Sequence, residues 1–121
     1  MRRNLFIILI FLITSISKSF SETFNNQENG YRINGEIKNM ADTSVILAYY
    51  FGGKQYARDT TNVVNGKLSF IGNKELKGGI YLIVLPDGKY FELIISEKNF
   101  SFITDKNNLV SSMRFIGSKE N

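Results

Sequence analysis

The side chains of this sequence that could take part in chemistry are carboxylates, serines and tyrosines. The 121-residue chain contains no histidine and no cysteine. Histidine is the commonest general base and metal ligand, and cysteine supplies thiol chemistry, disulfides and cysteine-rich zinc sites. Serine nucleophiles such as Ser69 and Ser101 therefore have no histidine that could activate them. Paired carboxylates, as in a hydrolase, remain the main catalytic possibility.

The acidic residues of residues 31–116 do not form a recognisable catalytic motif. They are spread over this region as Glu36, Asp42, Asp59, Glu75, Asp87, Glu92, Glu97 and Asp105. Asp42, Asp87 and Asp105 fall in predicted turns, where an aspartate side chain commonly hydrogen-bonds the local backbone. The residues after Asp105 lack the glycine and the distal glutamate of a helix-loop-helix calcium site. The sequence therefore predicts no catalytic, cofactor-binding or metal-binding residues and no enzyme activity, with a carboxylate hydrolase as a third alternative.

Tyrosines form the second set of candidate residues. Tyr49, Tyr50, Tyr56 and Tyr90, and also Tyr81, could contact a ligand or partner, because a tyrosine ring stacks while its hydroxyl forms hydrogen bonds. Tyrosine is also an ordinary strand residue. Coplanar exposed tyrosines along a groove would favour a carbohydrate- or peptide-binding module, whereas two acids buried in a cleft would favour an enzyme.

The first 21 residues predict a secretory signal peptide. A cationic start, an apolar run over residues 5–13 and small residues after it form the expected succession. The predicted cleavage site lies between Ser21 and Glu22, and the apolar run is shorter than the roughly 18 residues of a membrane span. We expect a periplasmic or otherwise exported protein with no membrane contact after cleavage; an uncleaved N-terminal anchor is the alternative.

Loss of the signal peptide changes the charge balance. The whole chain has a formal net charge of +4, and removal of Arg2, Arg3 and Lys18 leaves +1. The remaining basic residues are scattered singly, so no cluster could follow a phosphate backbone. We expect no nucleic-acid partner.

The rest of the chain predicts an all-β fold. Residues 31–38 alternate apolar and polar side chains, which is typical of a strand with one solvated face. Residues 44–51 and 80–85 are apolar on both faces and predict central strands, whereas residues 56–64 predict an edge strand or an irregular crossing. Further short strands are predicted at 68–71, 90–95, 100–104 and 113–116. Turn dipeptides separate these segments at Gly52-Gly53, Asn65-Gly66 and Asp87-Gly88.

These features together predict an antiparallel β-sandwich of about seven or eight short strands. The predicted organisation is a signal peptide at 1–21, a disordered lead-in at 22–30, the sandwich at 31–116 and the start of a truncated, mobile linker at 117–121. The predicted core comprises Ile33, Ile37, Leu47, Phe70, Leu82, Val84, Leu93, Ile95, Phe100 and Phe102.

The order of the segments resembles a known family. The matching stretches are residues 31–37, 42–50, 58–60, 65–70, 78–83 and 90–95, with 117–121 similar to the junction that follows. They resemble the β-rich N-terminal domain of unknown function (DUF4369-like) that precedes a thioredoxin-like domain in exported proteins of Gram-negative (Bacteroidetes-type) bacteria. The resemblance implies a non-catalytic accessory or interaction domain whose partner is another protein or a tethered thioredoxin-like domain. The alternative is a free-standing extracytoplasmic carbohydrate- or peptide-binding β-sandwich.

Overall fold

The computed structural model describes residues 29–121, so the predicted signal peptide and most of the predicted lead-in lie outside the described residues. Within this range the chain forms strands and no helix, and thus no helix that could cross a membrane. The eight strands are β1 (Tyr31–Lys38), β2 (Thr43–Phe51), β3 (Lys54–Val63), β4 (Lys67–Gly72), β5 (Gly79–Val84), β6 (Tyr90–Ile95), β7 (Asn99–Asp105) and β8 (Arg114–Ile116). Each one coincides with a segment that the sequence predicts.

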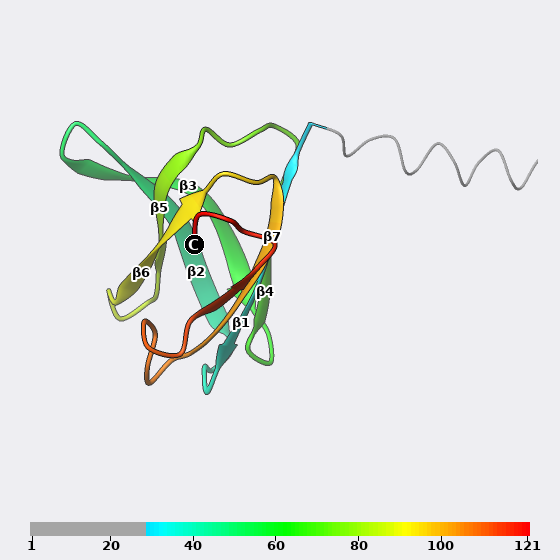
Figure 1. Cartoon of the computed structure of the whole chain (residues 1–121). Coiled ribbons are helices and arrows are strands. Elements are labelled where there is room, and N and C mark those ends of the chain that lie inside the picture. Colours follow the sequence, from blue (N-terminus) through cyan, green and yellow to red (C-terminus); the bar gives the residue numbers. More distant parts are fainter. Residues whose placement is uncertain (1–28) are drawn as a thin grey trace, which may run out of the picture.

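The strands form two sheets that pack face to face (Figure 1). Sheet A has the order β4-β1-β7-β8, and sheet B has the order β3-β2-β5-β6. The all-β sandwich is thereby confirmed. The two segments that are apolar on both faces, β2 and β5, occupy the middle of sheet B, and β3 is its edge strand, as predicted.

Two of the three predicted turn dipeptides adopt a backbone with positive φ at both residues, whereas in Asp87-Gly88 only Gly88 does, with φ of 85°. Asn65 and Gly66, between β3 and β4, have φ values of 52° and 76°, and Gly52 and Gly53, between β2 and β3, have values of 58° and 78°. Positive φ at both central residues matches the twist of the flanking strands, and asparagine and glycine tolerate it best. The turns therefore follow from local sequence.

One strand pair departs from the antiparallel prediction. β1 pairs with β7 in parallel, with Gly35 opposite Phe102, whereas the other ladders are antiparallel. A parallel pair requires a long crossover connection, and strands β2 to β6 supply it here. Turn signals report only on strands that are joined by a tight turn, so they could not reveal this pairing.

The core is centred on the ring of Phe102. Phe102 packs edge-on against Phe91 of sheet B, with ring centroids 5.3 Å apart and an interplanar angle of 66°. On the other side, a Cβ at Gly35 would overlap the Phe102 ring. Gly35 therefore leaves the space that the ring fills. The same relation recurs at the sheet edge, where the ring of Tyr31 occupies the space over Gly72.

Two of the predicted core residues lie outside this core. Tyr81 and Ile83 of β5 face the interior, so the alternating residues Leu82 and Val84 face the outside of sheet B. Leu82 is nevertheless fully buried, and Val84 is half-buried. The prediction is therefore confirmed for the burial of Leu82 and wrong for Val84, and the other eight predicted core residues are in the core cluster between the sheets.

The C-terminal segment is docked, contrary to the expectation that it is mobile. The backbone N–H of Lys119 donates to Glu97 Oε1 at 3.0 Å. The side chain of Asn121 forms two hydrogen bonds with the backbone of Ile94 on β6. Residues 117–121 thus pass from β8 to the edge of sheet B, where Figure 1 places the C-terminus.

We expect Gly35→Ala to lower the free energy of unfolding by about 1–3 kcal/mol, because overpacking a closed core has costs of this order. Phe102 is fully buried and already packed against Phe91, so its ring has little room to move. The measurement is urea denaturation. Gly78→Ala is the matched control, because a Cβ there meets only the carbonyl oxygen of Ile95, at an ordinary 3.4 Å. Equal stability of the two variants would contradict the packing argument.

Candidate functional site

The largest concave feature near the candidate tyrosines is a cleft, here the tyrosine cleft, between the β2–β3 hairpin and the connection from β4 to β5. Its volume is about 630 Å³, and its lining comprises Tyr49, Tyr50, Phe51, Arg58, Glu75, Lys77, Gly78, Gly79, Ile80 and Tyr81. The pairing of β2 with β5 ends at Tyr49 and Tyr81, and the hairpin continues beyond it. The cleft exists because these two strands part at that point.

Tyrosine rings form one wall of the cleft. Tyr49 lies 5.7 Å from Tyr56 with an interplanar angle of 25°, and 6.3 Å from Tyr81 with an angle of 54°. The Tyr81 hydroxyl donates to the backbone carbonyl of Lys77 at 2.7 Å. Tyr49 and Tyr56 therefore stack on each other rather than lying side by side, and Tyr49 is half-buried between its neighbours.

A β-bulge brings a cation and a carboxylate to this end of the sandwich. The register between β2 and β3 shifts between Leu47 and Ala48, whose partners are Asp59 and Ala57, so Arg58 is the extra residue. Bulges re-aim side chains in this way. Arg58 lines the cleft. Burial raises the pKa of Tyr31 and of Tyr81, and the positive charge of Arg58 offsets part of this rise.

Asp59 ties β3 to sheet A. The Tyr31 hydroxyl donates to Asp59 Oδ2 at 2.8 Å, and the Thr60 backbone N–H donates to Asp59 Oδ1 at 2.8 Å. Burial, followed by the hydrogen bond to Asp59 and the negative charge of this carboxylate, raises the pKa of Tyr31 to about 12. Asp59 therefore acts as a structural acceptor, with both oxygens engaged.

The outside of sheet B is a second candidate surface, here the apolar face. Its large side chains come from three strands and comprise Ile46, Tyr50, Ile80, Leu82, Val84, Tyr90 and Ile94. Ala48, Leu82 and Glu92 lie opposite one another in the middle of this face. A leucine that is fully buried on the outside of a sheet means that neighbouring side chains lie over it.

Tyr50 and Tyr90 cross the apolar face toward each other. Tyr50 is on β2 and Tyr90 is on β6, with β5 between them. The nearby Tyr50 hydroxyl raises the pKa of Tyr90, first through its electrostatic influence and then by accepting a hydrogen bond from the Tyr90 hydroxyl. The two side chains thus approach each other across β5. Both rings are still about half exposed, so they present aromatic surface to solvent.

The outside of sheet A is different in character. The outward residues of β1 are Arg32, Asn34, Glu36 and Lys38. Ser69 Oγ on the neighbouring strand donates to Asn34 Oδ1 at 2.7 Å. The exposed large apolar side chains on this side are Ile71 at the end of β4, with 52% exposure, and Ile116 on β8, with 60% exposure. The outside of sheet A is therefore mainly polar along β1, whereas apolar side chains from three strands lie together on the outside of sheet B.

The structure divides the predicted contact residues between these surfaces. Tyr49 lines the tyrosine cleft, where Tyr56 stacks on it, whereas Tyr90 belongs to the apolar face and Tyr50 to both. Sequence reasoning missed Arg58, since no local pattern marks it as the extra residue of a bulge.

The acidic side chains considered for a catalytic or metal site do not come together in one cluster. Asp87 accepts from the Lys89 backbone N–H and Asp105 accepts from that of Asn107, as predicted for turn aspartates. The bond from Asn107, followed by one from Asn39, lowers the pKa of Asp105. Asp42 instead accepts from the distant Asn65 backbone N–H. Among residues 29–121, no three metal-ligating side chains come together.

Comparison with known protein families gives a match over most of the chain. The family profile "Domain of unknown function (DUF4369)" matches residues 31–121. This range covers every strand of the sandwich and also the docked C-terminal segment. A search of curated proteins found no match to this chain.

We expect Asp59→Asn to lower the pKa of Tyr31, because the substitution removes a negative charge and keeps an acceptor. The pKa should stay above its ordinary value of 10.0, since burial is the largest cause of the shift. Carbon-13 NMR of labelled tyrosine measures it, with Asp87→Asn as the control. Because folding favours the neutral phenol, the stability that Tyr31 contributes is complete below pH 10 and is lost as the pH rises toward 12. An unchanged pKa in Asp59→Asn would contradict this assignment.

Proposed function

This chain belongs to the DUF4369 family of domains of unknown function, and from that premise we propose that it is a non-catalytic accessory domain that binds another protein. The observation that carries this proposal is the apolar face. Ile80 is 55% exposed there, and Tyr50 and Tyr90 are 45% and 48% exposed. Contiguous exposed apolar surface on a small domain is typical of an interaction site.

The proposed partner is a thioredoxin-like domain, either tethered or separate, in an exported assembly. The resemblance of the ordered segments to domains that precede such a domain supports this partner. The given sequence has no cysteine, so in such an assembly any thiol–disulfide exchange would take place on the partner. The signal-peptide pattern of residues 1–21 supports an extracytoplasmic location for both.

The tyrosine cleft supports a second candidate function, the binding of a carbohydrate or peptide. Tyr50 and Phe51 offer exposed ring surface, and Arg58 and Lys77 offer hydrogen-bond donors beside it. Aromatic surface with a few polar groups is the usual composition of a ligand cleft. The stacking of Tyr49 on Tyr56 leaves less ring area for a ligand, so we rank this function second.

We expect Ile80→Lys to weaken binding to a purified thioredoxin-like partner at least about tenfold, because a central charged residue would have to lose its water in the interface. The measurement is isothermal titration calorimetry. Ile71→Lys is the matched control, since Ile71 is 52% exposed on the opposite face while Ile80 is 55% exposed. An equal loss of affinity in both variants, or no loss of affinity in either variant, would exclude the apolar face as the interface.

For the second candidate, we expect soluble oligosaccharides to shift the backbone amide NMR signals of Gly78 and Gly79, which line the cleft. Phe51→Ala should weaken this binding, because it removes an aromatic side chain from the cleft. Val110→Ala controls for the loss of an exposed apolar side chain, since Val110 is 80% exposed and Phe51 is 73% exposed. If the amide signals of neither Gly78 nor Gly79 shift, the tyrosine cleft is not a carbohydrate-binding site.

A further inference from the structure

We propose that the outer edge of β6 binds an extended peptide of the partner by strand addition, and that Asn121 occupies part of this edge in the unbound domain. The inference rests on the proposed function, since it names the chemistry of the partner segment. It concerns the main-chain edge of β6 and the seam between β6 and β8, which adjoin the apolar face at Tyr90 and Ile94.

The first observation is the way in which Asn121 binds. Its Nδ2 donates to the backbone carbonyl of Ile94 at 2.6 Å, and its Oδ1 accepts from the Ile94 backbone N–H at 2.7 Å. A residue of a neighbouring antiparallel strand would make the same two bonds with its own N–H and C=O. The carboxamide thus takes the place of a main-chain peptide group at this edge.

The second observation follows from strand alternation. The N–H and C=O groups of Ile94 point away from β5, because Asn121 reaches them from the open side. Main-chain groups of alternate residues point the same way, so those of Tyr90 and Glu92 also face outward. β6 is the last strand of sheet B, and no strand among residues 29–121 pairs with this side of it.

The third observation is that this edge lacks the usual protection against added strands. Natural edges carry bulges, lysines or prolines that discourage further pairing. The other edge of sheet B, β3, has the bulge at Arg58, and its end continues through a tight turn into β4. β6 reads Tyr-Phe-Glu-Leu-Ile-Ile, with an unbroken register to β5 and a single charged residue.

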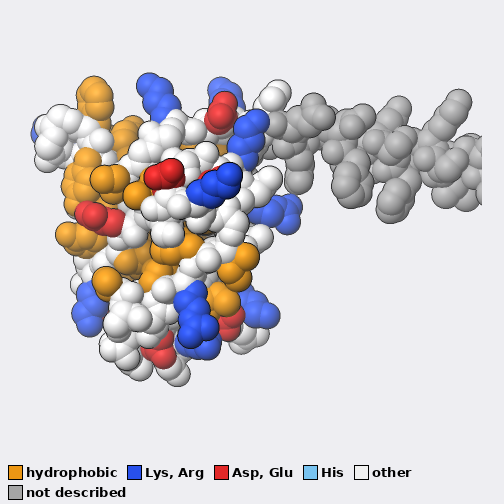
Figure 2. Space-filling model, in the orientation of Figure 1, with side chains coloured by type: hydrophobic (Ala, Val, Ile, Leu, Met, Phe, Trp, Pro, Cys, Tyr) orange, Lys and Arg blue, Asp and Glu red, His pale blue; other side chains and the backbone are white. Residues whose placement is uncertain are grey.

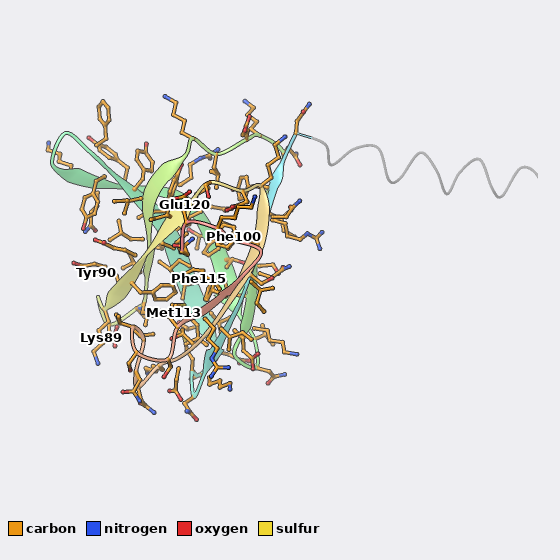
Figure 3. All side chains as sticks on the ribbon, in the orientation of Figure 1. Lys89, Tyr90, Phe100, Met113, Phe115 and Glu120 are labelled. Atoms are coloured by element: carbon orange, nitrogen blue, oxygen red, sulfur yellow. The ribbon has the colours of Figure 1, made fainter. Side chains whose placement is uncertain are left out.

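The seam beside β6 offers a surface for the side chains of an added strand. Met113 and Phe115 are half-buried and pack against the core, and Phe115 lies 6.5 Å from the Phe100 ring. In Figure 3 these side chains lie between the ribbons of β6 and β8, with Tyr90 near one end of β6. Hydrophobic side chains are visible at the centre of this face in Figure 2.

The seam widens at its far end. There a shallow hollow of about 610 Å³ lies between the β5–β6 turn and the connection from β7 to β8. Its lining includes Tyr90 of β6, and Leu109 and Val110 of that connection. An added strand that pairs with Tyr90 could therefore extend into this hollow.

The charge of Glu92 decides between a peptide and a second copy of the chain. If two β6 strands paired antiparallel so that Tyr90, Glu92 and Ile94 all took part, each Glu92 would lie opposite the other. Like charges directly opposite each other destabilise a strand pair. No ion pair of Glu92 occurs among the described residues, so a cation can approach it. The geometry therefore favours an extended peptide with lysine or arginine opposite Glu92 and apolar residues on either side.

The test uses the purified protein and a short fluorescein-labelled peptide of valine and threonine around a central lysine. We expect binding by fluorescence anisotropy, with amide NMR shifts at Tyr90 and Glu92. Asn121→Ala should tighten binding by about tenfold, because two competing hydrogen bonds are removed. Glu92→Lys should weaken binding of the lysine peptide and favour a matched peptide with central glutamate. A version of the lysine peptide with alternate backbone nitrogens methylated should bind neither the unsubstituted protein nor Asn121→Ala, because it cannot donate the main-chain hydrogen bonds.

Each other outcome would overturn the proposal. Equal affinity for the methylated peptide would show that main-chain pairing is not involved, and amide shifts confined to the tyrosine cleft would place the peptide elsewhere. Dimerisation of folded Asn121→Ala would make a second copy the occupant. No binding by this variant, with an unchanged NMR spectrum, would exclude the edge. Ile80→Lys should leave peptide binding intact, so these failures are separate from failure of the apolar face.

Discussion

The packing of Phe102 in the space over Gly35 is the constraint on which the rest of this sandwich depends. The ring contacts sheet B through Phe91 and can sit this deep only because Gly35 has no side chain. The parallel register of β1 and β7 brings the two residues opposite each other. Since packed interiors tolerate little change in volume, this contact fixes the spacing between the sheets and the alignment of their central strands.

The two outer faces then follow from strand alternation. Once Tyr81 and Ile83 face the interior, Leu82 and Val84 must face outward, and β2 contributes Ile46 and Tyr50 to the same side. In sheet A, the same alternation turns polar residues of β1 outward. Sheet B is therefore apolar on both sides, which a single sandwich does not require. An apolar outer face is better explained by binding than by the stability of the isolated fold.

The two sides of the sandwich differ in how their edge strands are joined. At one side, the bulge at Arg58 and the bond from Tyr31 to Asp59 join β3 to sheet A. At the other side, β6 and β8 leave a seam that the C-terminal segment crosses, where Asn121 satisfies one residue of the edge. Main-chain groups at a sheet edge need a partner or water. The side-chain hydrogen bonds of this short segment satisfy fewer main-chain groups of the β6 edge than a paired strand would.

The sequence by itself determined the strands, the turns and most of the core, because a period of two and the dipeptides that tolerate positive φ are local properties. It also excluded thiol and histidine chemistry by composition. Only the tertiary structure decided that β1 and β7 pair in parallel, that Leu82 faces outward, that Arg58 is the extra residue of a bulge and that Asn121 binds β6. These features depend on which distant segments meet and in which register. Register is set by the packing of the whole core, around Phe102 and Gly35, and a sequence that is apolar on both faces of a strand leaves it open.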